Sequence, residues 1–172
     1  MHPDVEISTR AALPPLRISW SLMVAASLAW AGLGMFAAPV VAAPETPAAA
    51  PWTMVLAALG VLSAVAAFVI DRAVITPQRL AAVIPVPDQA LIRRHLLAGH
   101  LVLWSFAQLP ALFGFAQLLL DGSLALHLAL CALSLATLAL LMPTRARIAA
   151  RVAAVLLAPA GQPTRKKTRQ DR

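Results

Sequence analysis

Amide, hydroxyl and imidazole side chains interrupt two strongly apolar stretches of this sequence. FAQLPALFGFAQLLL (106–120) and SLALHLALCALSL (123–135) belong to apolar runs that are long enough to cross a lipid bilayer. Lipid offers no hydrogen-bond partner, so polar groups at that depth either bond to neighbouring helices or line a path for an ion or solute. The sequence therefore predicts an intramembrane polar site, with Ser105, Gln108, Gln117, His127 and Ser134 as its candidate members.

A tight turn at 121–122 allows the depth of these residues to be counted. Asp-Gly at this point predicts a left-handed glycine cap and an antiparallel hairpin. Counting from the turn places Gln117 opposite His127 and Gln108 opposite Ser134, and each contact would contribute about 0.6–2 kcal/mol. The two glutamines are nine residues apart and point to opposite faces. Only one can face the fourth apolar segment directly, so the other must reach a different helix or another subunit.

Proline and small residues surround the first of these glutamines. Pro110 cannot donate to the carbonyl of Phe106, which predicts a kink in the helix and an acceptor that needs another donor. Ala107, Ala111 and Gly114 would let other helices approach closely. We expect this kinked segment to be a packing surface.

Metal binding and catalysis find little support in the sequence. His95 and His100 are five residues apart and do not share a helical face, whereas His127 and Cys131 do, but two ligands make a weak site. Serine, histidine and aspartate do not gather at one depth, and a glycine-rich phosphate loop is absent from the sequence. We expect neither an enzyme nor a cofactor or metal.

Composition and apolar runs define the fold class. Of the 172 residues, 60% are hydrophobic and 12% charged, whereas soluble domains are about 25% charged. We predict an all-α integral membrane protein with four transmembrane helices, at about 18–43, 52–75, 95–120 and 123–142, and an amphipathic interfacial helix at about 144–158. The predicted organisation is a cytoplasmic segment (1–17), a transmembrane domain (18–143), the interfacial helix (144–160) and a basic tail (161–172).

Charge predicts the orientation. With four spans, all 14 Lys and Arg residues fall on one side, and Glu45 and Asp121 on the other. The positive-inside rule then places both termini in the cytoplasm.

The abundant alanine, rare lysine and absent tyrosine are typical of a bacterial genome of high GC content, so we expect the bacterial inner membrane. Asp71 and Arg72 are interpreted as a helix stop at the inner boundary, whose charges reach water.

The first apolar segment permits an alternative. Arg10, Arg17, the apolar run and the small residues VVAAP also resemble a secretory signal. The run is longer than a signal core, which favours an uncleaved anchor. Cleavage would leave three spans in unchanged direction.

The C-terminal part suggests contact with anionic lipid headgroups. Ile148, Val152, Val155 and Leu156 share one face of the predicted interfacial helix, and Arg147 and Arg151 lie on another. The candidate lipid contacts are basic residues of this helix and the tail: Arg145, Arg147, Arg151, Arg165, Lys166, Lys167 and Arg169. These charges are equally compatible with a role in topology alone, and they indicate no specific nucleic acid.

The second and third apolar segments together resemble a known hairpin. AALGVLSAVAAFVI (57–70), a basic loop ending at 93–94 and AQLPALFGFAQLLL (107–120) are similar to the hairpin of proteolipid (c-type) subunits of rotary ATP synthases, and to small uncharacterised bacterial four-helix membrane proteins with such a helix. The resemblance implies a related hairpin fold. Gln108 stands where the family has its proton-carrying carboxylate, and an amide cannot exchange a proton near neutral pH.

These patterns favour a non-enzymatic structural or accessory membrane protein. It would assemble through the kinked third span, with itself or as a small subunit of a larger membrane complex. The alternative is a component of an ion or small-solute pathway built on the proteolipid-like hairpin.

Overall fold

The computed structural model describes residues 2–41, 50–84 and 88–157, which form helices and connecting loops without a strand. The helices of these residues are α1 (Pro3–Ala37), α2 (Ala50–Ala73), α3 (Pro77–Val83), α4 (Gln89–Asp121), α5 (Leu124–Leu140) and α6 (Arg145–Leu156). The predicted all-α class is confirmed for the described part of the chain.

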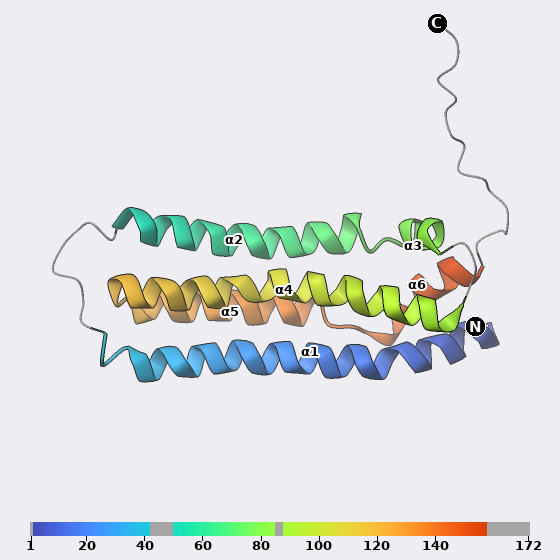
Figure 1. Ribbon diagram of the computed structural model, residues 1–172, viewed down its shortest axis with the longest axis horizontal. Coiled ribbons are helices and arrows are strands. Elements are labelled where there is room, and N and C mark those ends of the chain that lie inside the picture. The colour runs from blue at the N-terminus through green and yellow to red at the C-terminus, as the bar shows by residue number, and fades with distance from the viewer. Residues whose placement is uncertain (1, 42–49, 85–87, 158–172) are drawn as a thin grey trace, which may run out of the picture.

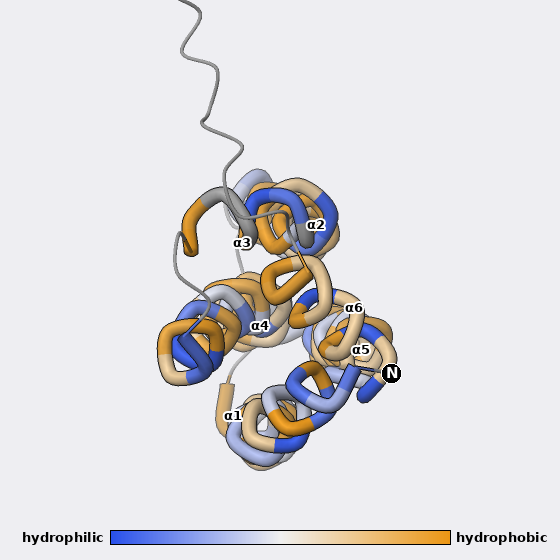
Figure 2. The backbone as a smooth tube through the Cα atoms, turned by 90° about the vertical axis from the view of Figure 1, so that its right-hand side faces the viewer, coloured by the Kyte–Doolittle hydropathy of each residue, from blue (hydrophilic) through white to orange (hydrophobic). Residues whose placement is uncertain are grey.

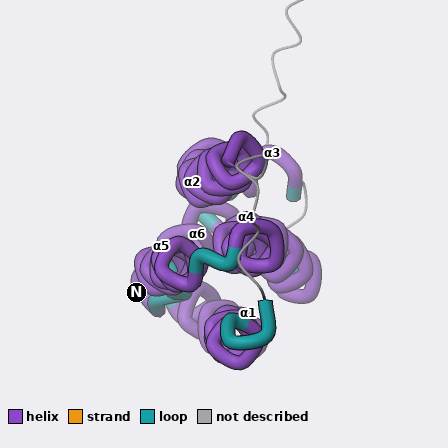
Figure 3. Tube along the Cα trace, turned by 90° about the vertical axis from the view of Figure 1, so that its left-hand side faces the viewer, coloured by secondary structure: helices purple, strands orange, loops and turns teal. Residues whose placement is uncertain are grey.

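Four long helices lie side by side, with α4 packed against α1, α2 and α5 (Figures 1, 2 and 3). The beginning of α1, the short α3 and α6 gather at one end of this bundle (Figure 1). Within the described residues, α1, α2 and α4 are long and apolar enough to cross a membrane, and α5 with α6, bent by 54°, makes up to a fourth span. The 17 residues of α5 reach about 25 Å, slightly less than the roughly 30 Å hydrocarbon core.

The first helix begins earlier than its apolar run. α1 starts at Pro3 and has 35 residues, about 52 Å, so its first turns extend well beyond the thickness of a bilayer core. A proline and two acidic residues in the first turn suit a helix N-terminus. Glu6 also pairs with Arg10 one turn later. The helix ends at Ala37, six residues before the predicted end of the first span.

The fourth helix is continuous and capped at both ends. α4 begins at Gln89, where the Asp88 carboxylate accepts a hydrogen bond from the Ala90 amide at 3.1 Å. It runs through Pro110 without interruption. Gly122 follows with φ 71°, and its amide donates to the Leu118 carbonyl at 2.9 Å. The predicted left-handed glycine cap is therefore confirmed.

The last helix, which the sequence predicts to lie at the membrane interface, packs its apolar face on protein. Ile148, Val152 and Val155 are buried, and α6 contacts α1 and α3. Thr144 caps its first turn by accepting from the Arg147 amide. Since the apolar side is covered by the bundle, only the opposite side of α6 is free to meet other molecules.

Candidate functional site

Two buried serines join three helices near the middle of the bundle. The Ser134 hydroxyl of α5 lies 2.8 Å from the Ala107 carbonyl of α4 and 3.1 Å from the Ser27 hydroxyl of α1. Ser134 has one proton, which goes to the carbonyl, so Ser27 donates to Ser134. Both serines are fully buried.

Gln108 extends this connection to a second point on α1. Its side-chain amide donates to the Met23 carbonyl at 2.8 Å. The sequence predicted that Gln108 would bond to Ser134. In the structure, Gln108 bonds instead to a backbone carbonyl of α1. The predicted depth is nevertheless confirmed, because Ser134 bonds to the carbonyl of Ala107, the residue next to Gln108.

His127 occupies a close fit between α1 and α4. Its Nε2 lies 3.1 Å from the Trp30 carbonyl, which only accepts, so Nε2 carries the proton. A Cβ added at Gly34 would lie 2.0 Å from this nitrogen, so a larger residue there would displace the imidazole. Phe115 contacts both rings, with centroids 5.2 Å from Trp30 and 6.0 Å from His127. The imidazole thus has a partner on α1 that the sequence did not predict.

Together, Ser27, Gln108, His127 and Ser134 form what we call the central seam. Each of its side chains bonds across a helix interface. Gln117 of α4 is also fully buried. Cys131 lies beside His127, with Sγ 3.8 Å from Nδ1. Within the described residues, no group of three or more His, Cys, Asp or Glu side chains is arranged to hold a metal ion.

Ser105 lies apart from the seam. It is exposed on α4, and its hydroxyl donates to the Leu101 carbonyl of the same helix at 2.8 Å. The predicted site residues therefore separate into three that bond across helices, Ser105 on the outer side, and the buried Gln117.

Small residues of α4 allow neighbouring helices to pack closely against it. Ala107, Ala111 and Pro110 are buried. A Cβ at Gly114 would lie 3.0 Å from the Leu130 Cβ of α5, and one at Gly60 of α2 would lie 3.5 Å from the Pro110 Cα. Neighbouring helices therefore approach this segment closely.

A charged cluster occupies the end of the bundle where α6 lies. The Arg151 guanidinium of α6 donates to the Asp71 carboxylate of α2 and, at 2.7 Å, to Nε2 of His100 on α4. His100 Nδ1 is 2.7 Å from the Leu96 carbonyl. Nδ1 therefore donates, Nε2 accepts, and the imidazole is neutral. We call Asp71, His100 and Arg151 the inner cluster.

The sequence analysis assigned other roles to this cluster. Arg151 was grouped with the lipid contacts, but its side chain points into the protein and the residue is only 8% exposed. Asp71 was interpreted as a helix stop open to water, but it holds Arg151. The sequence spacing along α6 could have indicated that Arg151 is buried. Arg151 lies three residues after Ile148 and four before Val155, and therefore shares their buried face.

Side chains from three helices donate hydrogen bonds to the carbonyls at the C-terminal end of α5. Trp20 Nε1 of α1 donates to the Leu138 carbonyl at 2.8 Å, and Trp104 Nε1 of α4 to the Leu141 carbonyl at 3.4 Å. A guanidinium nitrogen of Arg147 donates to the Leu140 carbonyl at 2.8 Å. The last carbonyls of a helix need such partners where water is scarce, so α5 can end early without a loss of hydrogen bonds.

The remaining basic candidates differ in position. Arg145 and Arg147 are exposed on α6. The Glu6 carboxylate accepts from Arg10 at 2.7 Å and from Arg145 at 3.1 Å, which ties the start of α1 to the start of α6. Four tail residues lie outside the described residues: Arg165, Lys166, Lys167 and Arg169.

Comparison with known proteins gave no relative. No protein-family model, curated protein or solved structure matches this chain.

Proposed function

We propose that this chain is a small structural or accessory protein of the bacterial inner membrane, without catalytic chemistry. The observation that supports the proposal most is the central seam. Ser27 bonds to Ser134, Ser134 to the Ala107 carbonyl, and Gln108 to the Met23 carbonyl. Groups that already bond between helices are suited to hold those helices together.

The proposed orientation has both termini in the cytoplasm. In support, the first turns of α1, the short α3 and α6 lie at the same end of the bundle (Figure 1). Exposed arginines belong to this end, among them Arg79, Arg93, Arg94 and Arg145. Bonds from α1 to α4 and α5 also favour a retained first helix over a cleaved signal.

We propose that assembly with a second copy or a larger complex uses the outer stripe of α4. This stripe consists of exposed residues at helical spacing: Leu101, Val102, Ser105, Leu112 and Leu119. Its small central residue, Ser105, would let another helix approach closely.

Cysteine cross-linking in native membranes tests this assembly. Cys131 is the single cysteine of the chain and is buried, so Cys131→Ala supplies a background free of thiols. In that background, Ser105→Cys should give a cross-linked product. Leu62→Cys, on the exposed side of α2, is the matched control and should remain monomeric. A monomer at Ser105→Cys and at Leu112→Cys would refute assembly through α4.

A pathway for an ion or small solute is the second candidate. Its support is the inner cluster, because ionisable residues within membrane-spanning helices, such as Asp71 of α2 and His100 of α4, often belong to such pathways. Proteoliposomes containing the purified protein and a pH-sensitive dye test it. A proton leak that Asp71→Asn abolishes would favour the pathway over the structural role.

A further inference from the structure

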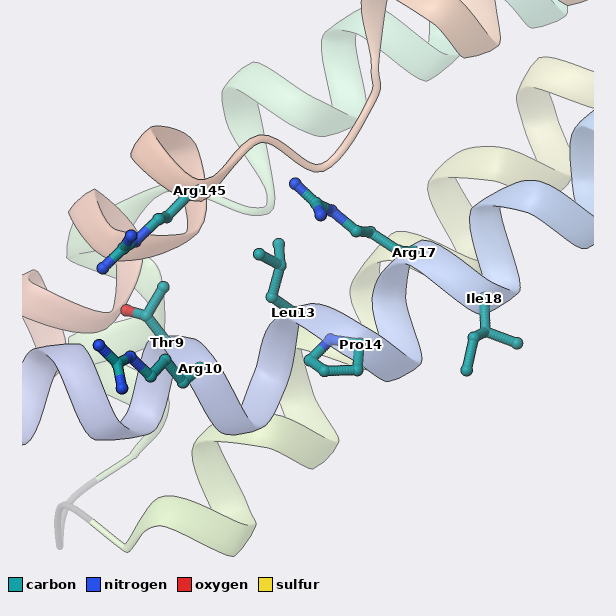
Figure 4. A pocket seen from close by; sticks show the side chains of 7 residues that line it. All are labelled: Thr9, Arg10, Leu13, Pro14, Arg17, Ile18 and Arg145. Atoms are coloured by element: carbon teal, nitrogen blue, oxygen red, sulfur yellow. The ribbon is translucent and has the colours of Figure 1, made fainter.

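A groove with basic walls lies between the first half of α1 and the start of α6. Its volume is about 400 Å³. Six residues of α1 and one of α6 line it (Figure 4): Thr9, Arg10, Leu13, Pro14, Arg17, Ile18 and Arg145. We call it the arginine groove. Its lining combines three guanidinium groups with aliphatic carbon, which suits a ligand with an anionic head and an apolar tail.

The residues that the structure describes do not balance the charges in the groove. Glu6 is the acidic partner of Arg10 and Arg145, and one carboxylate offsets only one of the three positive charges. Arg17 has no hydrogen bond or ion pair with any residue that the structure describes. The groove therefore keeps a net charge of +2, from three arginines and one glutamate.

The Arg17 end of the groove lies at the depth of the phospholipid headgroup layer, and Arg10 lies beyond the outer edge of that layer. The apolar run of α1 begins at Ile18, so Arg17 lies at the hydrocarbon boundary. Arg10 lies seven residues further out, about 10 Å along the helix. The headgroup layer adds about 5–8 Å on each side of the hydrocarbon core. Ile18 and Leu22 are exposed on α1 and continue from the groove into the apolar region.

We propose that the arginine groove binds one anionic phospholipid. Its anionic headgroup would lie between Arg17 and Arg145, and one acyl chain would follow Ile18 and Leu22. This site differs from the diffuse contact expected from the C-terminal basic residues, because two of its three arginines belong to α1. The proposed orientation decides only which leaflet supplies the lipid. The lipid site does not depend on assembly through α4.

Native mass spectrometry of the full chain in detergent tests the site. The protein is titrated with phosphatidylglycerol or with phosphatidylcholine of the same acyl chains. We expect one phosphatidylglycerol to bind in preference to phosphatidylcholine. Arg17→Gln and Arg145→Gln should each weaken this binding about fivefold, the effect of removing one charge near a headgroup. Arg79→Gln, exposed on α3 and outside the groove, is the matched control and should bind like the parent chain.

Three results of the lipid titration would overturn the proposal. The first is equal binding of phosphatidylglycerol and phosphatidylcholine. The second is an Arg17→Gln chain that binds phosphatidylglycerol as tightly as the parent chain. The third is an Arg79→Gln chain whose phosphatidylglycerol binding is weakened as much as that of Arg17→Gln. Glycerol 3-phosphate in solution separates a lipid site from a site for free phosphate esters: it should not displace the lipid, and displacement would contradict the proposal. Because detergent exposes both ends of the bundle, these outcomes do not depend on orientation or on the cross-linking result at Ser105.

Discussion

The central seam and the inner cluster stabilise the same bundle by different means. The seam uses neutral side chains, and most of its bonds end on backbone carbonyls. The inner cluster uses a guanidinium, a carboxylate and a neutral imidazole. His100 is 21 residues from Asp121 along α4, about 31 Å, so the proposed membrane placement puts His100 near the hydrocarbon boundary and Gln108 well inside it. Charge is placed where water is near, and neutral groups where it is not.

This difference predicts how each region responds to mutation. Loss of one neutral partner removes a single interhelical hydrogen bond, which contributes modestly in membranes. Loss of one charged partner leaves the other charge buried and uncompensated, which is far more costly. The inner cluster should therefore be the more sensitive of the two.

Asp71→Ala should have the largest effect. Removing the carboxylate leaves the Arg151 guanidinium buried without its counter-charge, and we expect the free energy of unfolding to fall by about 3–5 kcal/mol. SDS titration of the purified protein, followed by circular dichroism, measures it. The double variant Asp71→Leu with Arg151→Met should recover most of the loss, because an apolar pair of similar volume removes both charges. A loss below about 1 kcal/mol for Asp71→Ala would show that the pair is not buried as described.

Gly34→Ala should have an intermediate effect. The new Cβ would lie 2.0 Å from His127 Nε2, so the imidazole must move and lose its bond to the Trp30 carbonyl. We expect a loss of about 1–3 kcal/mol, typical of overpacking, in the same SDS titration. Gly32→Ala is the matched control, since a Cβ there meets nothing within 4 Å. Equal stability of the two variants would mean that His127 is not held against Gly34.

Gln108→Leu should have a smaller effect. It removes the hydrogen bond to the Met23 carbonyl and should lower the free energy of unfolding by about 0.6–2 kcal/mol. Ser105→Ala, whose hydroxyl bonds only within α4, should change it by less. If Gln108→Leu kept full stability but altered proton leak in proteoliposomes, Gln108 would belong to a pathway and not to packing.

The local features that the sequence predicted are those set by neighbouring residues. Gly122 takes the left-handed cap because a glycine follows a long helix at a tight turn. Counting from that turn gave the correct depth for Ser134 opposite 107–108. The count could not identify α1 as the partner of Gln108 and His127, because depth on a hairpin does not determine where a third helix packs.

The inner cluster shows a second limit. The apolar periodicity of α6 was visible in the sequence, and it predicts a helix with one apolar side but not which surface covers that side. The bend of 54° between α5 and α6 turns α6 onto the bundle end, and this places Arg151 between Asp71 and His100. Residues far apart in sequence meet there, and no local pattern specifies such a contact.

A double-mutant cycle on Ser27→Ala and Ser134→Ala tests the central claim most directly, namely that the intramembrane polar groups bond helices to one another. The two hydroxyls are 107 residues apart and 3.1 Å from each other. Unfolding free energies of the parent, both single variants and the double variant give their coupling energy. We predict a favourable coupling of about 0.6–1.7 kcal/mol. A coupling indistinguishable from zero would contradict it.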